Sequence, residues 1–142
     1  MISITETVTT DKPRDEVFAY LADFTTVSEW DPGIISSERT SGDGGMGTTY
    51  AVTSDFRGRK VDLVYEVVDY QEPEVIVLRG TANSVEALDR IEFHAHGDGT
   101  RVVYNAEFTM KGLLRFAEPF MGGMFTKLGR KAIAGMDRAL NG

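Results

Sequence analysis

The chain has 142 residues, 42% of them hydrophobic, and a formal net charge of −7. This size suits one domain with a buried core, so we expect a single domain over residues 1–142. The acidic charge disfavours nucleic acid as a partner, and the lack of cysteine excludes disulfides, thiolate nucleophiles and cysteine-based metal sites.

The N-terminal stretch is predicted to form a strand. Residues 1–6 contain neither a basic region nor an apolar signal core, and no run of about eighteen apolar residues occurs in the chain. We therefore expect a cytoplasmic protein without stable membrane insertion. Residues 2–10 alternate weakly between apolar and polar side chains, which favours a first strand.

Two short helices are predicted next. Pro13 and the acidic residues after it are typical of a helix N-terminus, and this helix should end near Asp23. A second short helix is expected over residues 24–30, because the Asp-Pro-Gly sequence of residues 31–33 stops it.

Residues 34–110 show the two-residue period of strands. Turn signals divide this segment into six strands of an antiparallel meander, and they lie at residues 41–45, 56–58, 72–73, 82–84 and 97–99. One side of the strand near residues 85–95 carries Val85, Ala87, Asp89, Ile91, Phe93 and Ala95. The other side is mostly polar, so one sheet face should be buried and the other exposed to water.

A long helix is predicted over residues 113–140. Its apolar stripe begins with bulky side chains, Phe120, Met121, Met124 and Phe125, and continues with the small residues Ala132, Gly135 and Ala139. The helix should therefore pack closely at its C-terminal end and stand off the sheet at its N-terminal end. The resulting wedge is a candidate ligand cavity.

This order of elements is that of the helix-grip fold, and the sequence resembles the START-like and Bet v 1-like (SRPBCC) superfamily. The resemblance covers the whole chain and is carried by residues 17–23, the Trp30-Asp31-Pro32 sequence, the glycine loop of residues 42–48, and residues 98–104. It looks closest to the bacterial branch of polyketide cyclases, dehydrases and lipid transport proteins. The resemblance implies an α+β fold in which a curved seven-stranded antiparallel sheet, two short helices and a long C-terminal helix enclose a ligand cavity.

Asp89 is a carboxylate on an otherwise apolar strand face. An unpaired buried charge is costly, so we expect a partner: Arg79 if its side chain turns inward, or the hydroxyls of Tyr65 and Tyr104. Two interpretations remain open, a structural polar pair or a group that contacts ligand or transfers protons. Asp89, Tyr104 and Arg79 are the candidate catalytic residues.

Two other motifs are interpreted as structural. His94 and His96 share the polar strand face with Glu92, so we expect exposed histidines, and we predict neither a metal site nor a cofactor. The glycine loop of residues 42–47 lacks the Gly-Lys-Ser/Thr of a phosphate-binding loop. It is either a plain strand connection or, as the resemblance implies, a gate at the cavity entrance.

The favoured function is binding, without catalysis or with weak catalysis, of a hydrophobic small molecule such as a lipid or polyketide. The predicted ligand-contacting residues are Trp30, Tyr50, Phe56, Tyr65, Asp89, Ile91, Phe93, Tyr104, Phe108, Phe120, Met121, Met124 and Phe125. Trp30 either lines the cavity mouth or packs in the core; its indole N–H needs a partner if it is buried, and Asp31 is the next residue in the sequence. The alternatives are a polyketide aromatase/cyclase or dehydratase that uses the same cavity, and a protein-interaction module. The sequence carries no signal for a particular oligomeric state.

Overall fold

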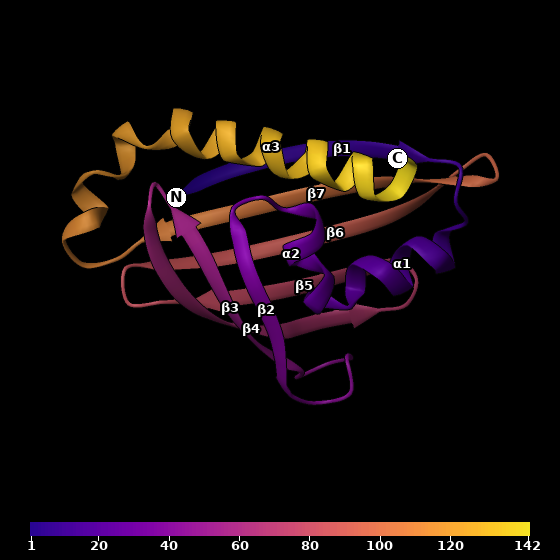
Figure 1. Ribbon diagram of the computed structural model, residues 1–142, viewed down its shortest axis with the longest axis horizontal. Helices are drawn as coiled ribbons and strands as arrows, with labels where there is room; N and C mark the ends of the chain where they lie inside the picture. The colour runs from indigo at the N-terminus through magenta and orange to yellow at the C-terminus, as the bar shows by residue number, and fades with distance from the viewer.

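The computed structural model describes residues 1–142 and is built around a seven-stranded antiparallel sheet. Its strands are β1 (Ile2–Thr10), β2 (Ile34–Ser41), β3 (Thr49–Phe56), β4 (Arg59–Gln71), β5 (Val75–Thr81), β6 (Val85–His96) and β7 (Gly99–Met110). The order across the sheet is β1-β7-β6-β5-β4-β3-β2, so the first strand lies beside the last. The sheet curves until β2 and β3 cross the direction of the other strands (Figure 1). The predicted helix-grip fold is confirmed.

The period-two pattern of the sequence places one face of the sheet against the core. On β6, Ala87, Ile91 and Phe93 are buried, whereas Arg90 between them is exposed. Asp89 shares the buried side with only 4% exposure. The prediction of one buried and one solvent-facing side is therefore confirmed for this strand.

The helices are α1 (Arg14–Ala22), α2 (Val27–Trp30) and α3 (Gly122–Asn141). The prediction that the last helix starts at residue 113 is wrong, because two 3₁₀ segments, Gly112–Phe116 and Glu118–Phe120, precede it. The Glu118 carboxylate accepts the Met110 backbone N–H at 3.0 Å and also pairs with the N-terminal ammonium group. These contacts hold the second 3₁₀ segment, Glu118–Phe120, against the end of β7, so this segment does not continue into α3 as one helix.

The C-terminal half of α3 packs closely, as its small residues predicted. At Gly135 an added β-carbon would overlap the backbone carbonyl of Trp30, so only glycine allows this approach of α3 to the end of α2. One turn and a half earlier, Gly129 lies over Ile4 of β1, and its β-carbon would meet that side chain at 2.7 Å. None of the helices combines the length and apolar character that a membrane crossing requires.

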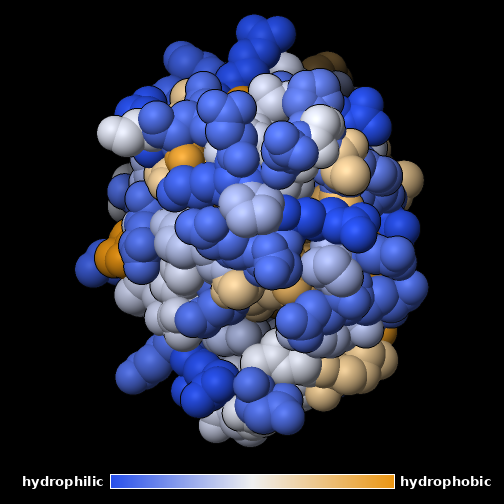
Figure 2. All heavy atoms as spheres, turned by 90° about the vertical axis from the view of Figure 1, so that its right-hand side faces the viewer, coloured by the Kyte–Doolittle hydropathy of each residue, from blue (hydrophilic) through white to orange (hydrophobic).

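The buried apolar side chains form two separate groups. The larger contains 24 residues and includes Trp30, Phe93 and Met136. The smaller contains only Ile4, Met110 and Phe125 beneath the first turns of α3. At the end of the molecule that carries α1 and the C-terminus, mostly hydrophilic side chains cover the surface (Figures 1 and 2). The interior is thus divided at the N-terminal half of α3, where the helix was expected to stand off the sheet.

Candidate ligand-binding site

A cavity of about 150 Å³ lies between the two groups of buried side chains. Its walls come from the sheet, the loop after α2 and the N-terminal half of α3, and 19 of its 26 lining residues are hydrophobic. From α3 the lining includes Phe125, Leu128 and Ala132. The cavity therefore occupies the place that the gradation of side-chain size along α3 predicted.

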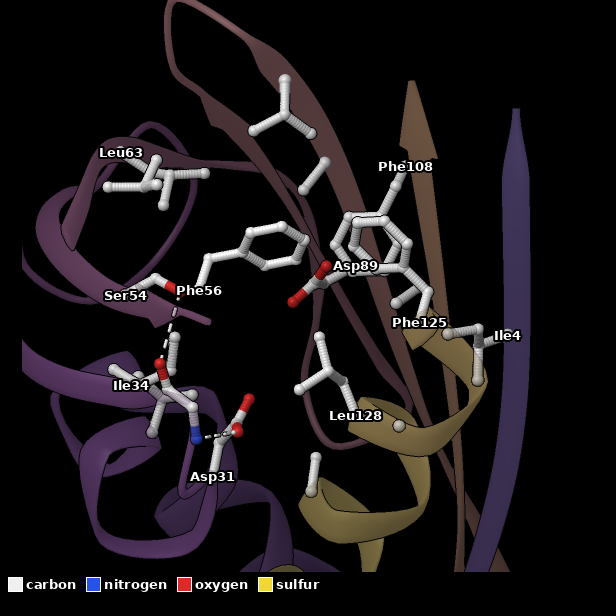
Figure 3. A pocket seen from close by; sticks show the side chains of 18 of the residues that line it. Ile4, Asp31, Ile34, Ser54, Phe56, Leu63, Asp89, Phe108, Phe125 and Leu128 are labelled. Carbon is white, nitrogen blue, oxygen red and sulfur yellow. Dashed lines mark hydrogen bonds between the residues drawn. The ribbon is translucent and has the colours of Figure 1, made fainter. Parts of the chain in front are cut away.

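Three phenylalanines from different elements form one side of the cavity (Figure 3). Phe108 of β7 stacks on Phe125 of α3 with ring centroids 4.5 Å apart, and Phe56 at the end of β3 lies 5.6 Å from Phe125. Their rings supply the largest apolar surfaces of the lining, and such surfaces favour an aromatic or aliphatic guest.

Asp89 points into this apolar cavity from the middle of β6 (Figure 3). The Tyr104 hydroxyl donates a hydrogen bond to its Oδ2 at 3.0 Å, and its Oδ1 has no partner. Burial raises the pKa of Asp89 to about 7, although the Tyr104 hydrogen bond opposes the shift. Burial and the neighbouring carboxyl also raise the pKa of Tyr104 well above its ordinary value, so its hydroxyl stays protonated.

Asp31 is a second carboxyl in the cavity, and the sequence reasoning did not include it among the ligand residues. Its Oδ1 accepts the Gly33 N–H at 2.9 Å, a local turn that fixes the carboxyl beside the cavity. Burial raises its pKa to about 6, partly offset by that bond. The Asp-x-Gly spacing of residues 31–33 indicates such a turn and was the available signal, but Asp31 was considered only as a hydrogen-bond partner of the Trp30 indole N–H. That assignment is wrong, because Trp30 Nε1 has no hydrogen-bond partner.

Arg79 lies outside the cavity. On β5 the inward positions are Leu78 and Gly80, so the intervening Arg79 faces solvent and pairs through Nε with Oε1 of Glu86 at 3.3 Å. Arg79 therefore cannot partner Asp89, and the expectation that it turns inward is wrong.

Of the predicted ligand residues, the structure brings seven together around the cavity. They are Phe56, Tyr65, Asp89, Tyr104, Phe108, Met121 and Phe125. The cavity lining also includes Ile4, Ile34 and Leu63, which were not predicted, although all three are apolar residues of predicted strands.

The other predicted ligand residues do not line the cavity. Four of them are buried in the larger core, namely Trp30, Tyr50, Ile91 and Phe93. Trp30 instead supports the wall from behind, because its ring meets that of Tyr104 edge-on at 5.9 Å. Met124 packs beside the smaller group, and Phe120 is 88% exposed because it precedes α3 and lies outside the helical register.

The histidines and the glycine loop lie away from the cavity. His94 Nε2 is 3.0 Å from Oε1 of Glu92 on the outer sheet face, and no three His, Cys, Asp or Glu side chains are grouped to hold a metal ion. No residue from 42 to 47 lines the cavity, and the Gly47 N–H donates to the Val67 carbonyl at 2.9 Å. This bond ties the loop to β4, which favours the strand connection over the gate.

Comparison with known proteins places this architecture among related chains. The family model described as polyketide cyclase / dehydrase and lipid transport matches residues 1–141. No curated protein matches the sequence.

Several solved structures share the fold at low sequence identity. A Thermus thermophilus protein has 14% identity and a TM-score of 0.81, with 97% of this chain and 96% of that chain covered. The Zhui aromatase/cyclase from a Streptomyces species has 17% identity and a TM-score of 0.76, covering 97% and 90%. A START superfamily protein from Mycobacterium smegmatis has 15% identity and a TM-score of 0.76, covering 97% and 96%.

Proposed function

This chain belongs to the polyketide cyclase/dehydrase and lipid transport family, and from that premise we propose that it binds a hydrophobic small molecule in the cavity beneath α3. The observation that carries the proposal is an internal space of about 150 Å³ with a lining that is hydrophobic at 19 of 26 positions. Empty apolar cavities of roughly this volume remain dry and accept apolar guests in other proteins. The function is expected to be binding, with shape and burial as the source of affinity.

The cavity volume limits the guest. A volume of about 150 Å³ suits one aromatic ring or a medium-length alkyl chain. Burying about 200 Å² of apolar surface, as an aromatic side chain does, contributes about 5 kcal/mol at roughly 25 cal/mol per Å², before the costs of association. A Kd no tighter than about 10⁻⁴ M follows for so small a guest.

A larger lipid or polyketide requires more space. Phe56 and Phe108 are only half-buried, and Leu114, from the 3₁₀ segment before α3, lines the same cavity. Outward rotation of these side chains extends the apolar surface toward solvent and accommodates a longer chain. We therefore place the bulk of a natural ligand between Phe125 and Leu114.

A titration with 1-octanol tests this function, with NMR shifts or calorimetry as the readout. Saturable binding is expected for the wild-type protein, and Leu128→Trp, which fills the cavity from α3, should weaken it at least about tenfold. Phe120→Ala is the matched control, because that side chain is 88% exposed and does not line the cavity. Equal octanol binding by Leu128→Trp and wild type would place the site elsewhere.

A cyclase or dehydratase activity is the second candidate, supported by one specific observation. Asp89 has its pKa raised to about 7 and is hydrogen-bonded to the Tyr104 hydroxyl, which suits proton transfer at neutral pH. In that case Asp89→Asn abolishes turnover of a poly-β-keto thioester but leaves octanol binding intact. Equal turnover by the variant would remove Asp89 from any such chemistry.

A further inference from the structure

The charged side chains of the cavity lining are all acidic. Three carboxyl side chains, Asp31, Asp55 and Asp89, are among the lining residues, and no lysine, arginine or histidine is. None of the four ion pairs of the protein involves any of these three carboxyls. An anionic guest would add negative charge to a site that already lacks a counter-charge.

One oxygen of this cluster has no partner at all. Asp89 is 4% exposed, and its Oδ1 accepts no hydrogen bond. Its neighbours across the sheet, Leu78 on β5 and Ala106 on β7, offer apolar side chains only. Because buried polar atoms are nearly always satisfied, the missing donor is expected to come from the occupant of the cavity.

The other groups around Asp89 do not supply a positive charge. Asp31 faces the same space from the loop after α2 (Figure 3), and β4 and β7 contribute the tyrosine hydroxyls of Tyr65 and Tyr104. Asp55, at the end of β3, already accepts the Gly58 N–H at 2.9 Å. The residues that α3 contributes carry no charge: Phe125, Leu128, Gly129 and Ala132.

Two basic side chains line a neighbouring hollow, not the cavity. Arg57 and Lys131 line a shallow surface depression that shares Gly33, Asp55 and Leu128 with the cavity lining. Neither forms an ion pair with a carboxyl of the cavity. The inner pair, Asp31 and Asp89, is thus left without a cation of the protein.

We propose that the cavity selects an apolar molecule that carries a protonated amine, with the ammonium group donating to Oδ1 of Asp89 and to the Asp31 carboxyl. This inference rests on the proposed binding function and assigns its ligand class. An ammonium group supplies up to three donors and a positive charge, which matches two carboxyls with free acceptor capacity. An alcohol supplies one donor without the charge, and a fatty acid adds like charge.

The proposal has a pH signature. The pKa of Asp89 is raised to about 7 and that of Asp31 to about 6, whereas an alkylamine stays protonated well above this range. Between pH 6 and pH 8 the ionised fraction of Asp89 rises from roughly a tenth to nine tenths, so amine affinity should increase about tenfold through Asp89 alone, and the ionisation of Asp31, from about half to nearly complete, adds to this increase. The affinity of an alcohol should change little or fall over the same interval.

Three probes with the same alkyl chain separate the head-group preference: octylamine, 1-octanol and octanoate. Their Kd values are measured at pH 6, 7 and 8 for the wild type, Asp89→Asn and Asp31→Asn. Asp62→Asn is the control, because this carboxyl is exposed on β4, accepts from Thr53 Oγ1 and does not line the cavity. At pH 8, where Asp31 and Asp89 are mostly ionised, each of the three variants removes about one negative charge, so a general electrostatic effect appears in all of them.

At pH 8 we expect octylamine to bind at least tenfold more tightly than 1-octanol, and octanoate to bind most weakly. Asp89→Asn should lose most of the amine preference and its pH dependence, with octanol affinity retained, whereas Asp62→Asn should match the wild type. Octanol binding as tight as octylamine, or an amine preference equal in all three variants, overturns the inference and leaves the binding function standing. Failure of all three probes to bind the wild type overturns the binding function itself, and the pH series on the wild type needs no variant to fold.

Discussion

The buried carboxyl of Asp89 makes the stability of the protein depend on pH in a direction that can be measured. Its pKa rises from an ordinary 3.8 to about 7 on folding, so the folded state holds the proton more tightly than the unfolded state does. The stability that this group contributes is complete below pH 3.8, is lost progressively as pH rises from 3.8 to 7, and is absent above pH 7. With about 1.4 kcal/mol for each pKa unit, this loss amounts to about 4 kcal/mol.

Asp89→Asn removes the ionisation and keeps a side chain of the same shape. At pH 5 we expect the variant to be more stable than the wild type by about 1–2 kcal/mol, because the unfolded wild-type carboxyl is then mostly ionised while the folded one still holds its proton. At pH 8.5 the variant should be more stable, by up to about 4 kcal/mol. A smaller slope should persist in the variant below pH 6, because the pKa of Asp31 is also raised, to about 6.

Urea denaturation followed by circular dichroism at half-unit steps from pH 5 to pH 8.5 measures this difference. The control Asp62→Asn should follow the wild-type curve, because that carboxyl is exposed. Tyr104→Phe should move the wild-type inflection to higher pH, because it removes the hydrogen bond that lowers the Asp89 pKa. If Asp89→Asn is less stable than the wild type by the same amount at every pH, Asp89 is not a costly buried carboxyl and the reasoning fails.

Two further predictions concern the packing of α3. Gly135→Ala should destabilise the protein by at least about 2 kcal/mol, because the added methyl group would overlap a backbone carbonyl at the end of α2. Gly123→Ala has open space around it and should stabilise the protein by up to about 1 kcal/mol. Thermal unfolding of the two variants and the wild type measures the difference. Phe125→Ala should lower the unfolding free energy by about 3–5 kcal/mol, because it removes a buried stacked ring. Phe120→Ala should change the unfolding free energy by less than about 0.5 kcal/mol, because that ring is exposed. Equal effects of the two substitutions would mean that the two rings are not placed as described.

The fold was predictable because its signals are local and repeated. Alternation along β6 and β7 and the glycine-bearing turns between strands specify an antiparallel meander, and small residues late in α3 specify its close end. The start of α3 was not predictable in this way. Phe120 continues the apolar spacing of the helix, but the contacts of Glu118 with Met110 and the chain terminus are tertiary and leave no trace in local periodicity.

The site residues were predictable only where the register of a strand or helix determines which way a side chain points. Asp89 and Tyr104 face inward by parity, and they do meet. Asp31 follows a helix in an irregular loop, where its direction depends on the hydrogen bond to Gly33 and not on any period. The two interpretations of Trp30 stayed open because a large buried ring can lie behind a cavity wall as readily as in it, and sequence spacing does not distinguish the two; the structure places it in the core.

A crystal structure determined under xenon pressure tests the hollow beneath α3 most directly, since xenon enters apolar cavities of about this volume in other proteins. We predict a xenon peak bounded by Phe56, Phe108 and Phe125, and its loss in Leu128→Trp. The absence of xenon between α3 and the sheet, with side chains filling that space, would contradict a ligand cavity in this protein.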